Sequence, residues 1–145
     1  MTTSAYAISV LNDEIFVVDY FGHHVKVFSY DGRLKRTFGG IGIGAGRMAC
    51  PCGIIASGEH VYVAERGGHS QTCSRVQVFT LQGEGVSVLP LRVPDNGSEG
   101  KTGLRCTKGL SLSGDRLLMV VEPCNTVVEK ASKVSEVLLL EGMPK

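Results

Sequence analysis

The fold is decided by a stretch that the chain contains twice, first as Ala7-Ile8-Ser9-Val10-Leu11-Asn12-Asp13-Glu14-Ile15-Phe16-Val17-Val18-Asp19 and then as Gly53-Ile54-Ile55-Ala56-Ser57-Gly58-Glu59-His60-Val61-Tyr62-Val63-Ala64-Glu65. Each copy has a small residue, an apolar run, a polar turn, a second apolar run and an acid. A third, weaker copy covers residues 109–122 and is one residue longer. The second apolar runs start at Ile15, Val61 and Leu117, so they lie 46 and 56 residues apart. Three repeated units follow from this spacing.

The remainder of each unit also predicts strands. Residues 25–28 and 76–79 alternate apolar and polar side chains, which is typical of a third strand. Asp31-Gly32 favours a hairpin because glycine tolerates positive φ, and residues 33–38 follow it as a fourth strand. The corresponding segments are residues 86–91 in the second unit and, less clearly, residues 127–129 and 134–140 in the third. A strand-only period of about 50 residues predicts an all-β chain of about three four-stranded antiparallel blades, as in a β-propeller.

These residues resemble the NHL repeat. The run Gly44-Ala45-Gly46-Arg47-Met48-Ala49-Cys50-Pro51-Cys52-Gly53-Ile54-Ile55-Ala56-Ser57 follows the opening of that repeat, and residues 19–28 carry its signature turn, with His23 in the histidine place. The resemblance covers roughly residues 3–140 and implies a single partial or open NHL-type β-propeller, with blades at about residues 3–39, 50–92 and 104–140. The pattern departs from the family at residues 67–72, which are inserted, and at Thr126, which replaces the histidine.

NHL propellers usually close with six blades, so the resemblance implies an open arc here. An open arc leaves two apolar blade faces bare, and such patches drive association. Three explanations stay open at this point. The missing blades belong to a longer gene product, two copies associate to complete the ring, or the protein is a degenerate form.

Composition excludes several classes of protein. Of 145 residues, 43% are hydrophobic, which is enough for a folded core. Fifteen basic and 14 acidic residues leave a net charge of +1, too weak a field to indicate nucleic acid or an anionic membrane. The chain shows no apolar run long enough to span a membrane and no signal peptide. Its five cysteines are an odd number, which argues against a disulfide framework and for a cytoplasmic protein.

The sequence predicts no catalytic residues, no metal and no cofactor. Hydrolase signatures and C-x-x-C pairs are absent, and one acid ends the second strand of each unit (Asp19, Glu65 and Glu122), which favours turn bonding over catalysis. The glycine run at residues 39–46 is interpreted as a connection between blades, because a phosphate loop needs a following helix. The four histidines are interpreted as structural or solvated.

Strand direction predicts one face that gathers candidate binding residues. Loops after the second and fourth strands of antiparallel blades emerge on the same side, and these loops carry Phe21, His23, His24, Arg47, Arg66, His69 and Arg75. The other side carries more acids, namely Asp13, Glu14, Asp31, Glu59 and Asp115. The expected function is a non-catalytic scaffold that binds a partner protein. The resemblance leaves two alternatives, an RNA-binding propeller face and a metal-dependent lyase or hydrolase.

Overall fold

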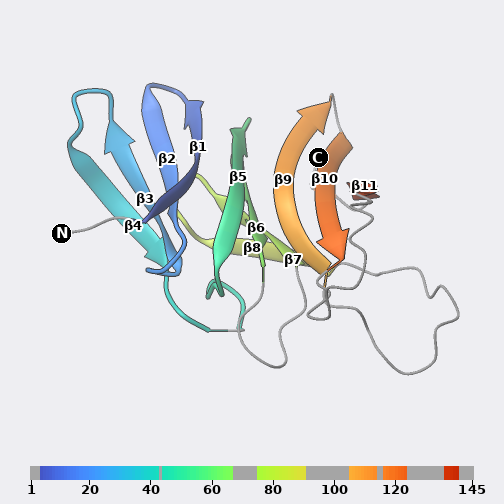
Figure 1. Ribbon diagram of the computed structural model, residues 1–145. Helices are drawn as coiled ribbons and strands as arrows, with labels where there is room; N and C mark the ends of the chain where they lie inside the picture. The colour runs from blue at the N-terminus through green and yellow to red at the C-terminus, as the bar shows by residue number, and fades with distance from the viewer. Residues whose placement is uncertain are drawn as a thin grey trace, which may run out of the picture.

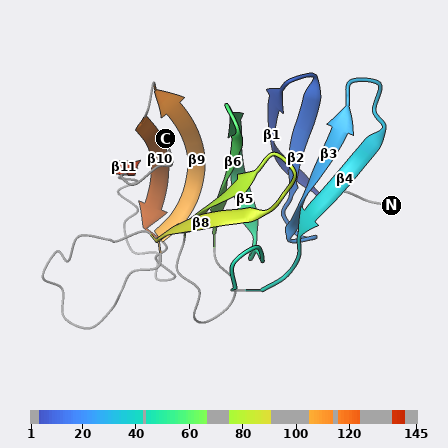
Figure 2. The same cartoon turned by 180° about the vertical axis from the view of Figure 1, so that it is seen from behind.

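The computed structural model describes residues 4–42, 44–66, 75–90, 105–113, 116–123 and 136–140. Over these residues the protein is all-β and contains no helix. Two four-stranded antiparallel sheets lie side by side, and a three-stranded sheet follows them (Figures 1 and 2). The predicted all-β class and the four-stranded antiparallel arrangement of the first two units are confirmed.

The first sheet is a meander in which each strand pairs with the next along the chain. Its strands are β1 (Ala5–Leu11), β2 (Glu14–Asp19), β3 (His24–Ser29) and β4 (Leu34–Gly39). The β1–β2 turn is made by Asn12 and Asp13, whose φ angles are 51° and 59°. Two consecutive positive φ values are typical of a type I′ turn, which Asn and Asp tolerate and whose twist suits a hairpin.

The second sheet repeats the first, irregularities included. It consists of β5 (Pro51–Ser57), β6 (His60–Glu65), β7 (Arg75–Thr80) and β8 (Gly85–Pro90), paired in that order. The pairing of the last two strands shifts register between Val27 and Phe28 in the first sheet, and between Val78 and Phe79 in the second. The pairing of the first two strands is shifted at equivalent positions too. The internal repeat therefore holds in backbone geometry as well as in sequence.

The third sheet contains β9 (Arg105–Ser113), β10 (Arg116–Pro123) and β11 (Glu136–Leu140), in the order β11-β10-β9. The sequence predicted a further strand at residues 127–129 between the last two, and those residues lie outside the described part of the chain. In the described structure β11 pairs directly with β10, for example Leu118 with Leu139, so the third sheet has three strands over the described residues.

The main hydrophobic core lies between the first two sheets. Phe16, Val18, Val25 and Val27 of the first sheet pack there against Ile54, Ala56, Val61, Val63 and Phe79 of the second. Met48, from the β4–β5 connection, is fully buried in the same core. A second cluster, which includes Tyr62, Val76 and Val78, contacts Leu110 and Leu112 of β9. Each sheet of the series thus packs on the next through a layer of apolar side chains.

Polar contacts fix the first two sheets at both ends of this layer. Ala56 N–H on β5 donates to Ser9 Oγ on β1 at 3.0 Å. Near the β7–β8 turn, the guanidinium of Arg36 donates to Leu81 O from Nη2 at 2.6 Å and from Nε at 3.0 Å. These contacts hold β1 against β5, and β4 against the turn of the neighbouring sheet.

Within the described residues, the structure has no helix of the length and apolarity needed to cross a membrane.

Candidate functional site at the loop edge

Three connections meet at one edge of the sheets, which we call the loop edge. It consists of the β2–β3 turn (residues 20–23), the described part of the β4–β5 connection (residues 40–42 and 44–50) and Arg66, which follows β6. In Figure 1 this is the lower edge of the first two sheets, whereas the β1–β2 and β3–β4 turns lie at the upper edge. The meander places alternate loops on opposite edges, as the sequence predicted.

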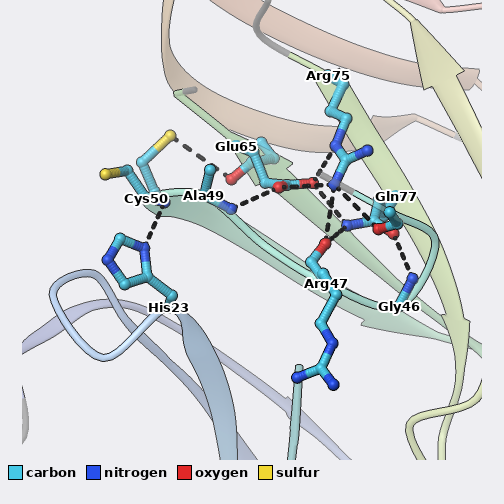
Figure 3. A network of polar contacts seen from close by, with 11 residues as sticks. His23, Gly46, Arg47, Ala49, Cys50, Glu65, Arg75 and Gln77 are labelled. Atoms are coloured by element: carbon cyan, nitrogen blue, oxygen red, sulfur yellow. Dashed lines mark hydrogen bonds and ion pairs between the residues drawn. The ribbon is translucent and has the colours of Figure 1, made fainter. Parts of the chain in front are cut away.

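Glu65 organises the loop edge of the second sheet from a buried position. Only 1% of the residue is exposed, yet its carboxylate accepts hydrogen bonds from Ala49 N–H at 2.8 Å, Arg75 Nε at 2.9 Å and Gln77 Nε2 at 2.8 Å (Figure 3). Gln77 also bonds to the β4–β5 connection, accepting from Gly46 N–H at 3.1 Å and donating to Arg47 O. These hydrogen bonds join β6 and β7 to residues 46–49. The Glu65 cluster therefore anchors the β4–β5 connection to the second sheet.

Asp19 plays the equivalent part in the first sheet. Its carboxylate accepts from Gly22 N–H at 2.9 Å and Ser4 N–H at 3.3 Å, and lies 3.4 Å from Lys26 Nζ. Burial acts to raise the pKa of Asp19, but the bonds from Gly22 and Lys26 outweigh it and hold that pKa below its ordinary value. Gly22 allows this turn to close, since a Cβ there would lie 2.7 Å from the Asp19 carboxyl. The turn bonding predicted for the recurring acids is confirmed for Asp19.

His23 links the two sheets across the loop edge. Its Nδ1 accepts a hydrogen bond from Cys50 N–H at 3.0 Å (Figure 3). Both residues have positive φ, 57° for His23 and 52° for Cys50, so each backbone turns sharply to form the contact. Accepting from a backbone N–H is a structural role for this imidazole, consistent with the prediction.

An aromatic cluster with one arginine lies at the loop edge and includes Tyr6 of the adjoining strand β1. Tyr20 stacks on Tyr6 and meets the Phe21 ring edge-on, with ring centroids 5.1 Å apart in both pairs. Arg66 Nη1 donates to the Tyr20 hydroxyl at 3.4 Å. Burial and a hydrogen bond with the side chain of Cys50 raise the pKa of Tyr20. Phe21 is 76% exposed and Tyr6 is 55% exposed, so the cluster presents aromatic surface to solvent beside a cation.

The residues predicted as a binding face divide into two groups. Phe21, Arg47 and Arg66 are exposed at the loop edge, and His23 lies half-buried beside them. In Figure 3 the guanidinium of Arg47 points away from the polar network while its carbonyl faces it. By contrast, Arg75 packs on Glu65, and His24 Nδ1 lies 2.6 Å from Gly22 O. His69 lies outside the described residues.

The described part of the glycine run forms a connection between sheets, as predicted. It leads from β4 to β5 and, over the described residues, precedes no helix that would complete a phosphate loop. Gly40 and Gly42 have positive φ, and a Cβ on either would approach the Arg47 side chain to 3.0 Å or closer. The glycines thus allow Arg47 to lie along its own loop.

Cysteine and histidine do not gather into a metal site within the residues that the structure describes. Cys50 and Cys52 do not form a disulfide, and the buried Sγ of Cys52 donates a hydrogen bond to Ala64 O at 3.6 Å. Tyr6, Tyr20 and Gln77 are members of these clusters that the sequence reasoning missed. The sequence did offer one signal for Gln77. It is a polar residue between Val76 and Val78, at the position equivalent to Lys26 in the first unit.

Comparisons with known proteins add little to this description. No protein-family model matches the chain, and no curated protein matches it. Among solved structures, the computationally designed Ika4 protein is similar over 95% of this chain and 92% of its own, with 12% sequence identity and a TM-score of 0.40. At that TM-score the likeness carries no argument about fold or function.

Proposed function

We propose that the chain is a partial NHL-type β-propeller that acts as a non-catalytic scaffold and binds a partner protein at its loop edge. The repeat of meander sheets packed face to face supports the propeller interpretation, with β1, β5 and β9 as the strands nearest the axis. The recurrence of backbone shifts at equivalent positions supports the assignment of the first two sheets as successive blades.

The observation that carries the binding proposal is the exposed aromatic cluster around Phe21. Phe21 is 76% exposed although its neighbours Tyr20 and Gly22 are held by defined contacts, so a large apolar ring is presented by a well-fixed turn. Aromatic residues and arginine are enriched where protein interfaces concentrate their binding energy. A fixed turn also limits the entropy lost on binding.

The charge of the loop edge supports an acidic partner segment. The described loop-edge residues include Arg47 and Arg66 and contain no Asp or Glu, while the nearby acids Asp19 and Glu65 are buried and paired. Acids lie instead on the opposite edge, at Asp13, Asp31, Glu59 and Glu84. Complementary charge steers association, so a negatively charged segment would approach the loop edge preferentially.

Photo-crosslinking tests this proposal directly. A benzophenone amino acid placed at position 21 is expected to capture a protein from extracts of the native cell. The same group at Tyr30, which is 61% exposed on the opposite edge, is the matched control and is expected to capture none of that protein. Equal capture of the same protein at both positions would reject the loop edge as the binding surface.

RNA binding is the second candidate, because arginine next to exposed aromatic rings also suits stacked, unpaired bases. Nuclease treatment separates the two functions in the same experiment. Crosslinked material that disappears with ribonuclease identifies RNA, and material that disappears only with protease identifies a protein. In the RNA case the affinity would also fall steeply with added salt, because phosphate contacts release counterions.

A further inference from the structure

One face of the first sheet is apolar and uncovered in the described structure. Val10, Ile15 and Phe28 lie in one cross-strand row and Leu34 pairs with Phe28, while Ile8 and Val17 form the next row. The opposite face of this sheet, with Phe16 and Val27, is the one buried against the second sheet. Ile8 is 64% exposed, and Val10 and Leu34 are each 48% exposed. We call these six residues the end face.

The same positions are fully covered in the second sheet. Through the repeat, Ile8, Val10, Ile15, Val17 and Phe28 correspond to Ile54, Ala56, Val61, Val63 and Phe79. The latter five are at most 8% exposed, and all belong to the core between the first two sheets. The end face is therefore an unpaired copy of a surface that this fold buries against another sheet.

The charged residues beside the end face already have hydrogen-bonding or ion-pair partners, as do the equivalent residues of the second sheet. Asp19 and Lys26 are 3% and 4% exposed and form an ion pair, in the places that Glu65 and Gln77 take beside the core. A sheet that packed on the end face would not strand a buried charge, which is the usual cost of covering such positions. Both the apolar residues and the charged residues of this surface could therefore be buried without leaving an unpaired charge.

The third sheet, at the opposite end of the series, has apolar sequences that could cover such a face. Residues 117–121 and 137–140 are apolar at every position, so apolar residues occur on both alternating sets of positions in β10 and β11. Over the described residues, the third sheet contacts the second through Leu110 and Leu112 of β9. A strand that is apolar on both sets is typical of a sheet covered on both faces.

We propose that the end face is covered by the third sheet of a second copy of this chain. The second copy is favoured because the surface that covers the equivalent positions in the second sheet is itself a sheet of this repeat, and this chain supplies a sheet with apolar residues to spare. Each copy would place its third sheet on the end face of the other, so two identical contacts would close the pair and prevent open-ended growth. This inference does not depend on what the loop edge binds.

Sedimentation velocity over a concentration series tests the pairing. We expect the wild-type chain to sediment as a dimer that dissociates on dilution. Ile8→Lys and Val10→Lys should each weaken the dimer by about 100-fold, because a charge replaces a central apolar contact. Matched controls are Ile41→Lys and Val86→Lys, whose wild-type side chains are 72% and 45% exposed away from the end face; these should leave the dimer unchanged. Circular dichroism establishes that each variant is folded.

A mixing experiment distinguishes the proposed arrangement from one in which two end faces meet each other. Equimolar Ile8→Lys and Ile8→Glu would restore a dimer if the two substituted positions faced one another across the interface. The proposed contact of end face with third sheet predicts that the mixture stays monomeric. A monomeric wild type at all concentrations, a dimer insensitive to both end-face variants, or a dimer restored by mixing would each overturn the proposal.

Discussion

Arg75 Nε donates to Glu65 Oε2 at 2.9 Å, and the same carboxylate receives Ala49 N–H at 2.8 Å from the connection between the two sheets. One buried acid therefore ties the end of β6, the start of β7 and the β4–β5 connection together. Asp19 ties the corresponding segments of the first sheet. The recurring acid is thus the element that fixes the loop edge in both units.

Replacing Glu65 with glutamine should destabilise the protein strongly. In Glu65→Gln the side chain keeps its size, but the Arg75 cation loses its counter-charge and an amide N–H is turned toward donors. Breaking a buried, hydrogen-bonded ion pair costs about 3 kcal/mol. Urea denaturation measures the loss in unfolding free energy. Glu59→Gln, at an exposed turn position, is the control and should change it by no more than about 0.5 kcal/mol. Equal losses of unfolding free energy in the two variants would show that Glu65 does not anchor the connection.

Two equivalent glycines test the packing of the first sheet on the second. Gly32 and Gly83 occupy matching hairpin turns, with φ of 86° and 95°. A Cβ on Gly32 would meet open space, whereas one on Gly83 would lie 2.4 Å from Phe38 Cγ of the first sheet.

Gly32→Ala should therefore cost about 1 kcal/mol from backbone strain alone. Gly83→Ala should cost about 2 kcal/mol more, because the Phe38 ring has to move. The comparison uses unfolding free energies from denaturant titrations. If the two substitutions lowered the unfolding free energy equally, the close approach of Gly83 to Phe38 would be contradicted.

The free energy of unfolding should depend on pH through the ionisation of Glu14. Its hydrogen bond with Arg36, reinforced by Lys35, lowers the pKa of Glu14 from 4.5 to about 2. A carboxyl whose pKa is depressed by folding stabilises the protein above its unfolded pKa, and this contribution is lost as the pH falls toward the folded value. The wild type should therefore exceed Glu14→Gln in unfolding free energy above about pH 4.5, and the difference should shrink toward pH 2. Denaturant titrations at several pH values give this difference, and one independent of pH would contradict the assignment.

The strands could be predicted from sequence because each has its own signal. Alternation at Val25-Lys26-Val27-Phe28 and the Asp31-Gly32 turn act over a few residues, so the strands of the first two sheets appear close to where they were predicted. The third unit lacks such a turn signal, and its apolar runs fit more than one register. The direct pairing of β11 with β10 was not predicted, because such pairing depends on tertiary contacts that local patterns do not encode.

The loop edge was predicted only in part, because sequence places a residue on an edge without revealing its partners. Arg75 and Arg66 look alike in sequence, yet Arg75 pairs with buried Glu65 while Arg66 contacts Tyr20 at the surface. The difference arises from strand position, since Arg75 begins β7 opposite Glu65 and Arg66 follows the end of β6. Tyr6 was missed because its contact with Tyr20 joins β1 to the β2–β3 turn, 14 residues further along the chain.

We propose above that the loop edge binds a partner protein through the cluster around Phe21. Isothermal titration with the protein captured at position 21 tests it most directly, using wild type, Phe21→Ala and Tyr30→Ala. Both substitutions remove an exposed aromatic ring, so neither should disturb the fold. We expect Phe21→Ala to weaken binding by at least about tenfold, while Tyr30→Ala stays within about twofold of wild type. Wild-type affinity in Phe21→Ala would contradict it.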